Sequence, residues 1–318
     1  MGRIAVTGGA GFVGTNLAIA LLKERHEVVI VDDFSSGLRS NVEKLTCDVR
    51  EVSLVDDKKL ENALEGCDYI YHLGARGSVP RSIRNPRATH DVNTLGTLNV
   101  LEIARKFGTP IAFSSSSSVY GSNPDLPKNE KMWTGPITPY AASKLAGEAL
   151  VQGYAASYGI TAITYRFFNI FGPWQRPDHD YAAVIPKWIW KILHDEEIEV
   201  FGDGNQSRDF TYIDDVIHIL ITGMNQRINH PSPINLAFGE RISLNCLIEY
   251  LRERKDDLLV RYRPERSGDV KDSQNNPTHL KSIFPNVKPA DFKVSLFKVW
   301  DWLETFGPQI ANGPQVLD

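Results

Sequence analysis

Short runs of β-branched and aliphatic residues alternate with longer amphipathic segments through the first half of the chain. The runs predict strands at 3–7, 27–32, 45–47, 69–73, 110–114 and 161–167. Apolar residues at helical spacing predict helices between them, at 14–24, 54–64, 89–107 and 141–158. Strands that alternate with helices indicate βαβ units, a parallel sheet and right-handed crossovers.

The pattern changes beyond residue 169. A loop rich in Gly and Pro at 172–177 leads to predicted helices at 182–193, 244–254 and 296–306, a turn at 202–204 and a strand at 233–237. We therefore expect an α/β fold, a Rossmann-type doubly wound parallel sheet with a smaller, interleaved C-terminal domain. The sheet domain would take residues 1–169 and about 209–239, and the second domain about 170–208 and 240–318.

Composition excludes several classes of function. The 318 residues carry 35 Lys and Arg against 39 Asp and Glu, and this net charge of -4 argues against a nucleic-acid polymer as partner. The longest apolar runs have strand length, which argues against a membrane span. Cys47, Cys67 and Cys246 show no metal or redox spacing. We expect free thiols, no metal site and, since the chain opens on a predicted strand without a leader, a cytoplasmic protein.

The first predicted strand runs into a glycine loop, Thr7–Gly14, which opens the first predicted helix. Glycines at 8, 11 and 14 allow a tight turn and let backbone amides approach a pyrophosphate at the helix N-terminus. The second strand ends in Asp32 and Asp33, where a carboxylate would hold the adenosine ribose hydroxyls. A carboxylate there would repel a 2′-phosphate, which favours NAD over NADP, although Arg39 nearby leaves NADP as an alternative.

A serine run, 114–118, follows a strand and opens over the carboxyl edge of the predicted sheet, where open α/β sheets bind ligands. Downstream, Tyr140 and Lys144 are four residues apart and therefore share one helix face. A lysine ammonium and a cationic nicotinamide would both favour the phenolate and lower the tyrosine pKa. We therefore expect Tyr140 to act as an acid–base catalyst beside Lys144.

In this combination the chain resembles the extended short-chain dehydrogenase/reductase family, in particular its NAD-dependent nucleotide-sugar epimerases and dehydratases. The likeness spans nearly the whole chain and is most pronounced toward UDP-N-acetylglucosamine 4-epimerases. Gly74 departs from the alanine usual in the family. The motifs that carry the resemblance are 7–14, Asp32, Asp48-Val49, 72–75, Asn93, Ser116, Tyr140, Lys144, 166–169, 202–204, 207–210 and 266–270.

The resemblance implies a set of residues for each ligand. Catalysis would rest on Ser116, Tyr140 and Lys144. The NAD site would comprise Gly8, Gly11, Phe12, Val13, Asp32, Asp33, Ser35, Ser36, Gly37, Asp48, Val49, Leu73, Gly74, Ala75, Asn93, Ser114, Tyr140, Lys144 and Phe167. The UDP-sugar site would comprise Ser78, Val79, Arg81, Ser116, Ser117, Ser118, Tyr140, Asn169, Ala183, Val184, Phe201, Arg208, Arg266, Asp269 and Ser273. His72 we interpret as a packed strand-end residue.

The same resemblance implies the reaction. Tyr140 would take the proton of the sugar 4-hydroxyl while C4 gives a hydride to NAD, and the 4-keto sugar would turn over before the hydride returns. Ser116 would hydrogen-bond the 4-oxygen. Arg208 and Arg266 would bind the diphosphate, since a guanidinium suits phosphate oxygens, and Asp269 the uridine ribose.

Two positions bear on which reaction and which sugar. In the resembling dehydratases an acid pair follows the equivalent of Ser116, whereas this chain has Ser117 and Ser118, which disfavours dehydration. In the resembling epimerases a bulky aromatic at the position of Ser273 restricts the pocket to glucose, and a small residue leaves room for an N-acetyl group. We therefore expect UDP-GlcNAc and UDP-GalNAc as substrates, with UDP-Glc and UDP-Gal still open because room discriminates weakly.

Three alternatives remain at this stage. Arg76, Arg81 or Arg176 could meet a C6 carboxylate, which would indicate a UDP-glucuronic acid 4-epimerase. A decarboxylase or dehydratase is a second alternative, and a non-catalytic NAD-binding protein is a third. In the resembling enzymes the helices at 89–107 and 141–158 pair subunits, so we expect a homodimer.

Overall fold

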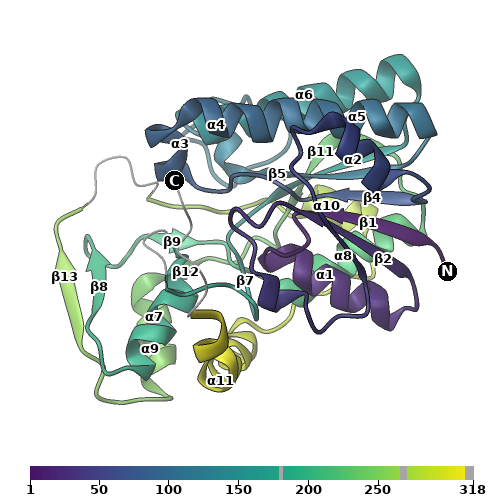
Figure 1. The fold of residues 1–318 in the computed structure, drawn as a ribbon. Coiled ribbons are helices and arrows are strands. Elements are labelled where there is room, and N and C mark those ends of the chain that lie inside the picture. Colours follow the sequence, from purple (N-terminus) through teal and green to yellow (C-terminus); the bar gives the residue numbers. More distant parts are fainter. Residues whose placement is uncertain (179–181, 266–270, 312–318) are drawn as a thin grey trace.

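A seven-stranded sheet of parallel neighbours forms the centre of the computed structural model, which describes residues 1–178, 182–265 and 271–311 apart from the side chain of residue 310 (Figure 1). Every neighbouring pair in this sheet runs parallel. In spatial order the strands are β11 (His230–Leu236), β6 (Ala162–Phe167), β5 (Ile111–Ser116), β4 (Tyr69–His72), β1 (Arg3–Thr7), β2 (Glu27–Asp32) and β3 (Asp48–Glu51).

Helices cover both faces of the sheet (Figure 1). One face carries α2 (Asp57–Leu64), α5 (Gly96–Phe107) and α6 (Pro139–Tyr158). Three short segments lead into α5 along the chain: α3 (Val79–Arg84), α4 (Pro86–His90) and the π-helical η2 (Asp91–Leu95). The other face carries α1 (Phe12–Lys23), α8 (Ile213–Asn225) and α10 (Thr278–Ile283). The Rossmann-type doubly wound α/β fold expected from the sequence is therefore confirmed.

A second group of elements lies beyond the carboxyl edge of the sheet (Figure 1). Its helices are α7 (Val184–Leu193), α9 (Leu244–Arg252) and α11 (Phe292–Ala311). Its strands form three small pairs: β7 (Ile170–Phe171) with β10 (Thr211–Tyr212), β8 (Ile198–Phe201) with β13 (Val260–Arg263), and β9 (Ser207–Arg208) with β12 (Ile242–Ser243). Two 3-10 turns complete the described elements, η1 (Arg39–Asn41) and η3 (Ser117–Tyr120).

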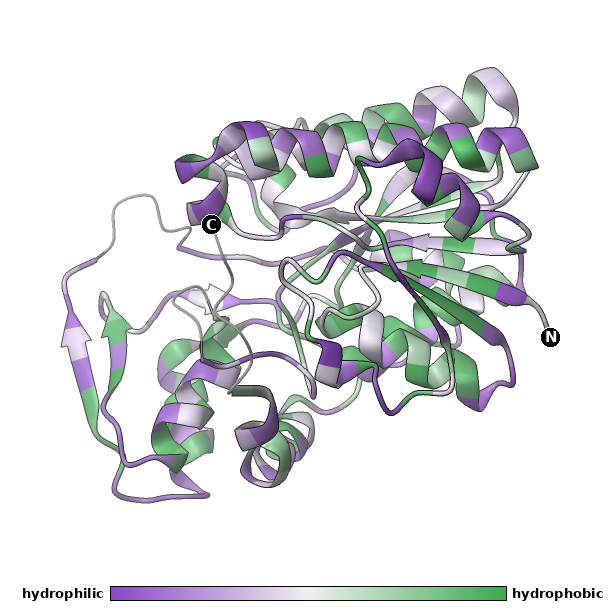
Figure 2. Cartoon of the chain, viewed as in Figure 1, coloured by the Kyte–Doolittle hydropathy of each residue, from purple (hydrophilic) through white to green (hydrophobic). Residues whose placement is uncertain are grey.

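The hydrophobic pattern follows burial. Strand β2 is buried from Val28 onward, as expected for a parallel strand covered on both faces, and β1 and β2 are hydrophobic over much of their length in Figure 2. Helix α6 begins where the Thr138 side chain accepts a hydrogen bond from the Ala141 amide, with Pro139 in the first turn. It ends at Gly159, which has a φ of 69°.

Several predicted boundaries are wrong. The strand expected at 45–47 lies at Asp48–Glu51 instead, because β3 is an edge strand whose partly exposed, charged residues hide the apolar pattern. The helix expected from residue 54 begins at Asp57, where Asp56 caps it through the Lys59 amide. The helix expected at 89–107 begins earlier and contains the π-helical turn η2, which apolar periodicity does not reveal.

No helix in the described ranges combines the length and apolar character that crossing a bilayer requires.

Candidate active site

The glycine loop between β1 and α1 forms a cradle that only glycine permits. Gly8 has a φ of 67°, and a Cβ built on it would lie 2.7 Å from the Cα of Gly74 on the neighbouring loop. A Cβ on Gly14 would lie 2.3 Å from the Gly8 carbonyl oxygen. The loop backbones thus meet without side chains at the N-terminus of α1, the geometry that fits a dinucleotide pyrophosphate. Phe12 and Val13 form the first turn of the same helix.

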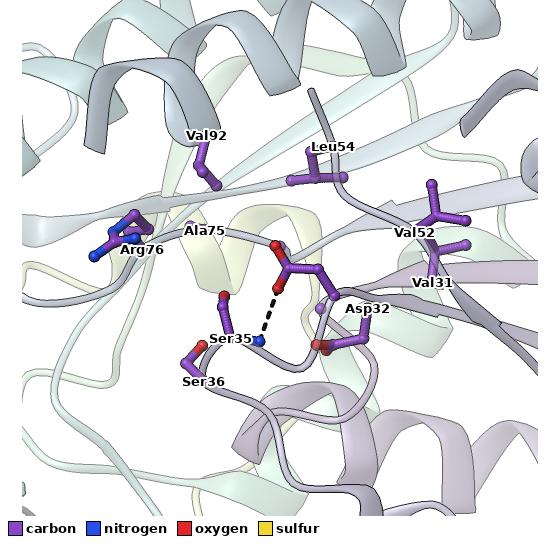
Figure 3. A pocket seen from close by; sticks show the side chains of 12 residues that line it. Val31, Asp32, Ser35, Ser36, Val52, Leu54, Ala75, Arg76 and Val92 are labelled. Atoms are coloured by element: carbon purple, nitrogen blue, oxygen red, sulfur yellow. Dashed lines mark hydrogen bonds between the residues drawn. The ribbon is translucent and has the colours of Figure 1, made fainter. Parts of the chain in front are cut away.

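A pocket opens where this loop meets the ends of β2 and β4 (Figure 3). It contains many of the residues expected at the NAD site and adds Val31, Val52, Leu54, Arg76 and Val92. Its lining consists of Gly8, Val31, Asp32, Asp33, Ser35, Ser36, Val52, Leu54, Gly74, Ala75, Arg76 and Val92.

Asp32 is anchored at the end of β2 and is 8% exposed. Its Oδ2 accepts a hydrogen bond from the Ala10 amide at 3.0 Å, and its Oδ1 accepts one from the Phe34 amide at 2.9 Å. Burial raises the pKa of Asp32, against the effect of these two hydrogen bonds. A carboxylate has further lone pairs, so Asp32 can still accept from ribose hydroxyls. A Cβ on Gly37 would lie 2.9 Å from its Oδ1, so glycine is needed beside it.

Asp48 and Val49, which we expected at the NAD site, are not among the residues that line this pocket. Both begin β3, and the register pairs Asp48 with Val29, three residues before the pocket end of β2. The Asp48 carboxylate binds Arg3 and Arg50, which lowers its pKa. Because parallel strands present their carboxyl ends at one edge, Val52 and Leu54 line the pocket in their place. A correct prediction of where β3 ends would have identified Val52 and Leu54 as pocket residues.

Arg39, the residue that left NADP as an alternative cofactor, contacts Glu51 and Phe34. Its guanidinium forms an ion pair with Glu51 at 2.6 Å and lies over the Phe34 ring. Two further acids, Asp32 and Asp33, face the pocket, and the Asp33 Oδ1 accepts a hydrogen bond from the Ser35 amide at 2.9 Å. This charge arrangement favours an unphosphorylated adenosine ribose.

The serine run and the Tyr-Lys pair come together at the end of β5. Tyr140 is half-buried in the first turn of α6 and hydrogen-bonds Ser116, and the Ser116 Oγ accepts from the Ser118 amide at 3.2 Å. In the protein alone, desolvation raises the pKa of Tyr140 and outweighs the Ser116 hydrogen bond, so the predicted lowering depends on the cationic nicotinamide. Ser117 and Ser118 form η3, and the buried Ser118 Oγ has no partner among the described residues.

Lys144 is 4% exposed and lies one helical turn beyond Tyr140. Its Nζ donates a hydrogen bond to the Ser114 carbonyl oxygen at 2.8 Å. Burial lowers the pKa of Lys144 to about 8, and the negative charge of Glu148 opposes this. The ammonium is therefore held by β5, while the Ser114 Oγ donates to the His72 carbonyl oxygen at 3.2 Å.

A buried ion pair behind Lys144 was missed by sequence reasoning. The Arg166 Nε and Nη2 donate hydrogen bonds to the two carboxylate oxygens of Glu148 at 2.8 and 2.7 Å. The side chains of Glu148 and Arg166 are 2% and 5% exposed, and the Ser115 Oγ donates a hydrogen bond to Glu148 at 2.5 Å. Arg166 also donates to the Tyr120 hydroxyl at 2.9 Å. Glu148 lies four residues after Lys144 on the same helix, and this spacing is the signal that could have found it.

His72 and Asn93 lie in the interior beside the site. The His72 ring bonds Thr7 and Thr97, and burial lowers its pKa to about 3, which confirms its structural role. The Asn93 amide donates to the Ser143 hydroxyl at 2.9 Å, while its Oδ1 accepts from the Arg76 amide at 2.7 Å. Asn93 thus links the pocket loop to α6.

Residues expected at the sugar nucleotide gather from several segments. The Asn169 Nδ2 donates to the Asp209 carbonyl oxygen at 3.2 Å and to the Ser273 Oγ at 3.4 Å. Arg208 donates to the carbonyl oxygens of Ser207 and Lys271. Elsewhere, Ser78 caps α3, whose first turn holds Val79 and the buried Arg81, and Ala183 and Val184 begin α7.

Other expected residues lie near strand ends. Phe167 pairs with Ser116 across β5 and β6, Leu73 follows β4, and Phe201 ends β8. Gly11 caps the N-terminus of α1. Arg266 and Asp269 lie outside the described residues. Across the described ranges no cluster of three or more His, Cys, Asp or Glu side chains could hold a metal ion.

Comparison with known proteins adds the following similarities. Residues 4–237 match the model of the NAD dependent epimerase/dehydratase family. The chain is 34% identical over 311 residues to a putative UDP-glucose 4-epimerase of Methanocaldococcus jannaschii, which covers 95% of this chain and 98% of that protein. It is 35% identical over 296 residues to UDP-glucuronic acid decarboxylase 1 of Xenopus tropicalis, covering 91% of this chain and 66% of that protein.

Among solved structures, the chain resembles the UDP-N-acetylglucosamine 4-epimerase from Methanobrevibacter ruminantium M1 in complex with UDP-N-acetylmuramic acid. The TM-score is 0.90 and the identity 33%, over 96% of this chain and 98% of that one.

Proposed function

Because this chain belongs to the NAD-dependent epimerase/dehydratase family and uses NAD as its cofactor, we propose that it is a UDP-sugar 4-epimerase. Its proposed substrates are UDP-GlcNAc and UDP-GalNAc, with UDP-Glc and UDP-Gal as smaller substrates of the same pocket. The observation that carries this proposal is the arrangement of Tyr140, Ser116 and Lys144, with uncharged serines on the two following positions.

Each catalytic residue has a defined task in this proposal. When bound, NAD supplies a hydride acceptor that gives the hydride back to the same sugar carbon. Tyr140 takes the proton of the sugar 4-hydroxyl and returns it, and Ser116 hydrogen-bonds the 4-oxygen. The Lys144 ammonium, held on the Ser114 carbonyl, would stabilise the Tyr140 phenolate that accepts this proton and that re-forms when the proton is returned.

The residues after Ser116 separate epimerisation from elimination. Loss of water from the sugar needs a group that removes a carbon-bound proton and a group that protonates the leaving hydroxyl. Ser117 and Ser118 are alcohols and cannot act as a carboxylate acid–base pair. The buried Ser118 Oγ, which lacks a partner in the described part of the chain, is instead available for a sugar hydroxyl or an N-acetyl group.

The size of the side chain at Ser273 supports an N-acetylated sugar. Its Oγ accepts a hydrogen bond from Asn169, and its amide donates to the Ser207 carbonyl oxygen at 3.1 Å. The small side chain therefore lies beside Asn169, a residue of the proposed sugar site, and takes up less of that site than an aromatic ring would.

A uronic acid substrate has weaker support. Of the three arginines that could meet a C6 carboxylate, Arg76 lines the NAD pocket and Arg176 bonds Asp178 at 2.6 and 3.0 Å. Arg81, buried in α3, is the remaining candidate. The similarity to a UDP-glucuronic acid decarboxylase makes this comparison worth testing directly.

We further propose that the sheet domain, 1–169 with about 209–239, binds NAD and that the remaining segments bind the UDP-sugar. A cytoplasmic homodimer that pairs through α5 and α6 belongs to the same proposal. These helices pack against each other and expose Phe107 and Tyr158 at their ends.

A substrate panel tests the proposed function. The purified protein is incubated separately with UDP-GlcNAc, UDP-Glc and UDP-glucuronic acid, with NAD present, and products are analysed by mass spectrometry and chromatography. We expect an isomer of unchanged mass, formed fastest from UDP-GlcNAc. Loss of water or of carbon dioxide would instead identify a dehydratase or a decarboxylase.

A further inference from the structure

Arg76 lies on the loop after β4, and its side chain lines the NAD pocket (Figure 3). Its Nε and Nη2 atoms are buried and have no hydrogen-bond partner among the described residues. A guanidinium remains charged at any physiological pH, and buried N–H groups without an acceptor are costly. Nε and Nη2 are adjacent donors of one planar fork, the arrangement that binds two oxygens of a carboxylate or phosphate.

The backbone of Arg76 is fixed on both sides. Its amide donates to the Asn93 Oδ1 at 2.7 Å, and its carbonyl oxygen accepts from the Asn93 Nδ2 at 3.4 Å. Asn93 in turn donates to Ser143, which directly precedes Lys144 on α6. The guanidinium therefore stands on a loop held by the catalytic helix, which gives it a defined position at the pocket wall.

The pocket acids do not neutralise this charge. The Asp32 and Asp33 carboxylates accept backbone amides, and no hydrogen bond or ion pair in the described ranges joins either of them to the Arg76 guanidinium. None of the ion pairs in the described ranges joins Arg76 to a carboxylate. An anion that enters the pocket can supply the missing acceptor, and the glycine cradle at Gly8 has the geometry that fits a pyrophosphate at this end of the sheet.

We propose that Arg76 is an additional cofactor-binding residue that contacts the pyrophosphate of NAD. Its guanidinium would complement the backbone amides of the glycine loop in binding the phosphates. The inference depends on the use of NAD, which the chain shares with its family, and does not depend on which sugar is epimerised.

Binding measurements on Arg76→Gln test the proposal without any turnover. Calorimetric titration with NAD should show about 10- to 100-fold weaker binding than the wild type, since a hydrogen bond to a charged group corresponds to one to two decades in affinity. Titration with ADP-ribose should show the same loss, and titration with adenosine should show none. Arg76→Lys keeps the charge and loses the planar pair of donors, so its NAD affinity should lie between those of the wild type and of Arg76→Gln.

The control is Arg252→Gln, which removes an equal charge from an exposed pair with Glu249 on α9 and should leave NAD affinity unchanged. Thermal melting without ligand shows whether each variant is folded. If Arg76→Gln does not fold, the Arg76→Lys titration decides. Unchanged NAD affinity in the folded variants would overturn the proposal. An equal loss of affinity for adenosine and ADP-ribose would also overturn it, because Arg76 would then contact the adenosine. A loss of affinity for NADP alone would overturn it as well, because Arg76 would then contact a 2′-phosphate.

Discussion

At the scale of single residues, burial sets the charges that this site can use. The Lys144 ammonium donates a hydrogen bond to a main-chain carbonyl oxygen, and the pKa of Lys144 is about 8. The charged and neutral forms of Lys144 therefore interconvert only slightly above neutral pH. The pairing of Tyr140 with Lys144 could be predicted from their spacing, and the role of Ser116 from the family resemblance. Their pKa values could not, because desolvation depends on what packs around each group.

Asp209 gives a prediction for pH dependence. Burial raises its pKa to about 7, while its Oδ2 accepts the amides of Gly239 and Asn275. Between about pH 4 and 7 the folded protein therefore binds more protons than the unfolded chain, and stability falls as pH rises through this window. Asp209→Asn keeps the accepting oxygen, so its melting temperature should depend less on pH across the same range. Parallel slopes for variant and wild type would refute this assignment.

At the scale of elements, parallel strands bring distant residues to one edge. The parallel sheet and the glycine loop could be predicted because buried strands and Thr7–Gly14 have strong local patterns, whereas the strand order was not predicted. The end of β3 could not, because an edge strand carries charged residues such as Asp48 and Arg50. The π-helical turn η2, which positions Asn93 against Ser143, also leaves no periodic signal.

The Glu148–Arg166 pair joins α6 to β6, and Ser115 ties β5 to the same carboxylate. Glu148→Gln leaves Arg166 buried without its counter-charge, so we expect a loss of about 3–5 kcal/mol in the free energy of unfolding. Chemical denaturation measures this change. Glu249→Gln, at an exposed pair on α9, should shift the denaturation midpoint very little. Equal effects of the two substitutions would contradict a structural role for the buried pair.

The glycine cradle gives a second prediction for an element. Gly14→Ala forces a methyl group to within 2.3 Å of the Gly8 carbonyl oxygen, so the loop must shift and NAD affinity should fall at least tenfold. Gly153 on α6 has no atom within 4 Å of a built Cβ and is the matched control. Gly153→Ala should raise stability by up to about 1 kcal/mol. Calorimetry with NAD and thermal melting give the two readouts, and an intact NAD affinity in Gly14→Ala would refute the cradle.

At the scale of the whole molecule, assembly is the property least accessible to sequence. Phe107 and Tyr158 are 37% and 57% exposed at the ends of α5 and α6. Light scattering should give twice the mass of one chain for the wild type, because two copies of this helix pair would bury these rings. The Phe107→Asp/Tyr158→Asp double variant should shift toward the mass of a single chain. A monomeric wild type would contradict the proposed homodimer.

The central claim is that Tyr140 catalyses 4-epimerisation and that the uncharged Ser117 and Ser118 do not support dehydration. Proton NMR of UDP-GlcNAc incubated with the protein and NAD tests this claim most directly. The account predicts that the axial H4 signal of UDP-GlcNAc is replaced in part by the equatorial H4 signal of UDP-GalNAc until a constant ratio is reached. Tyr140→Phe should abolish this change while it still binds NAD. No UDP-GalNAc from the wild type, or equal conversion by Tyr140→Phe, would contradict the account.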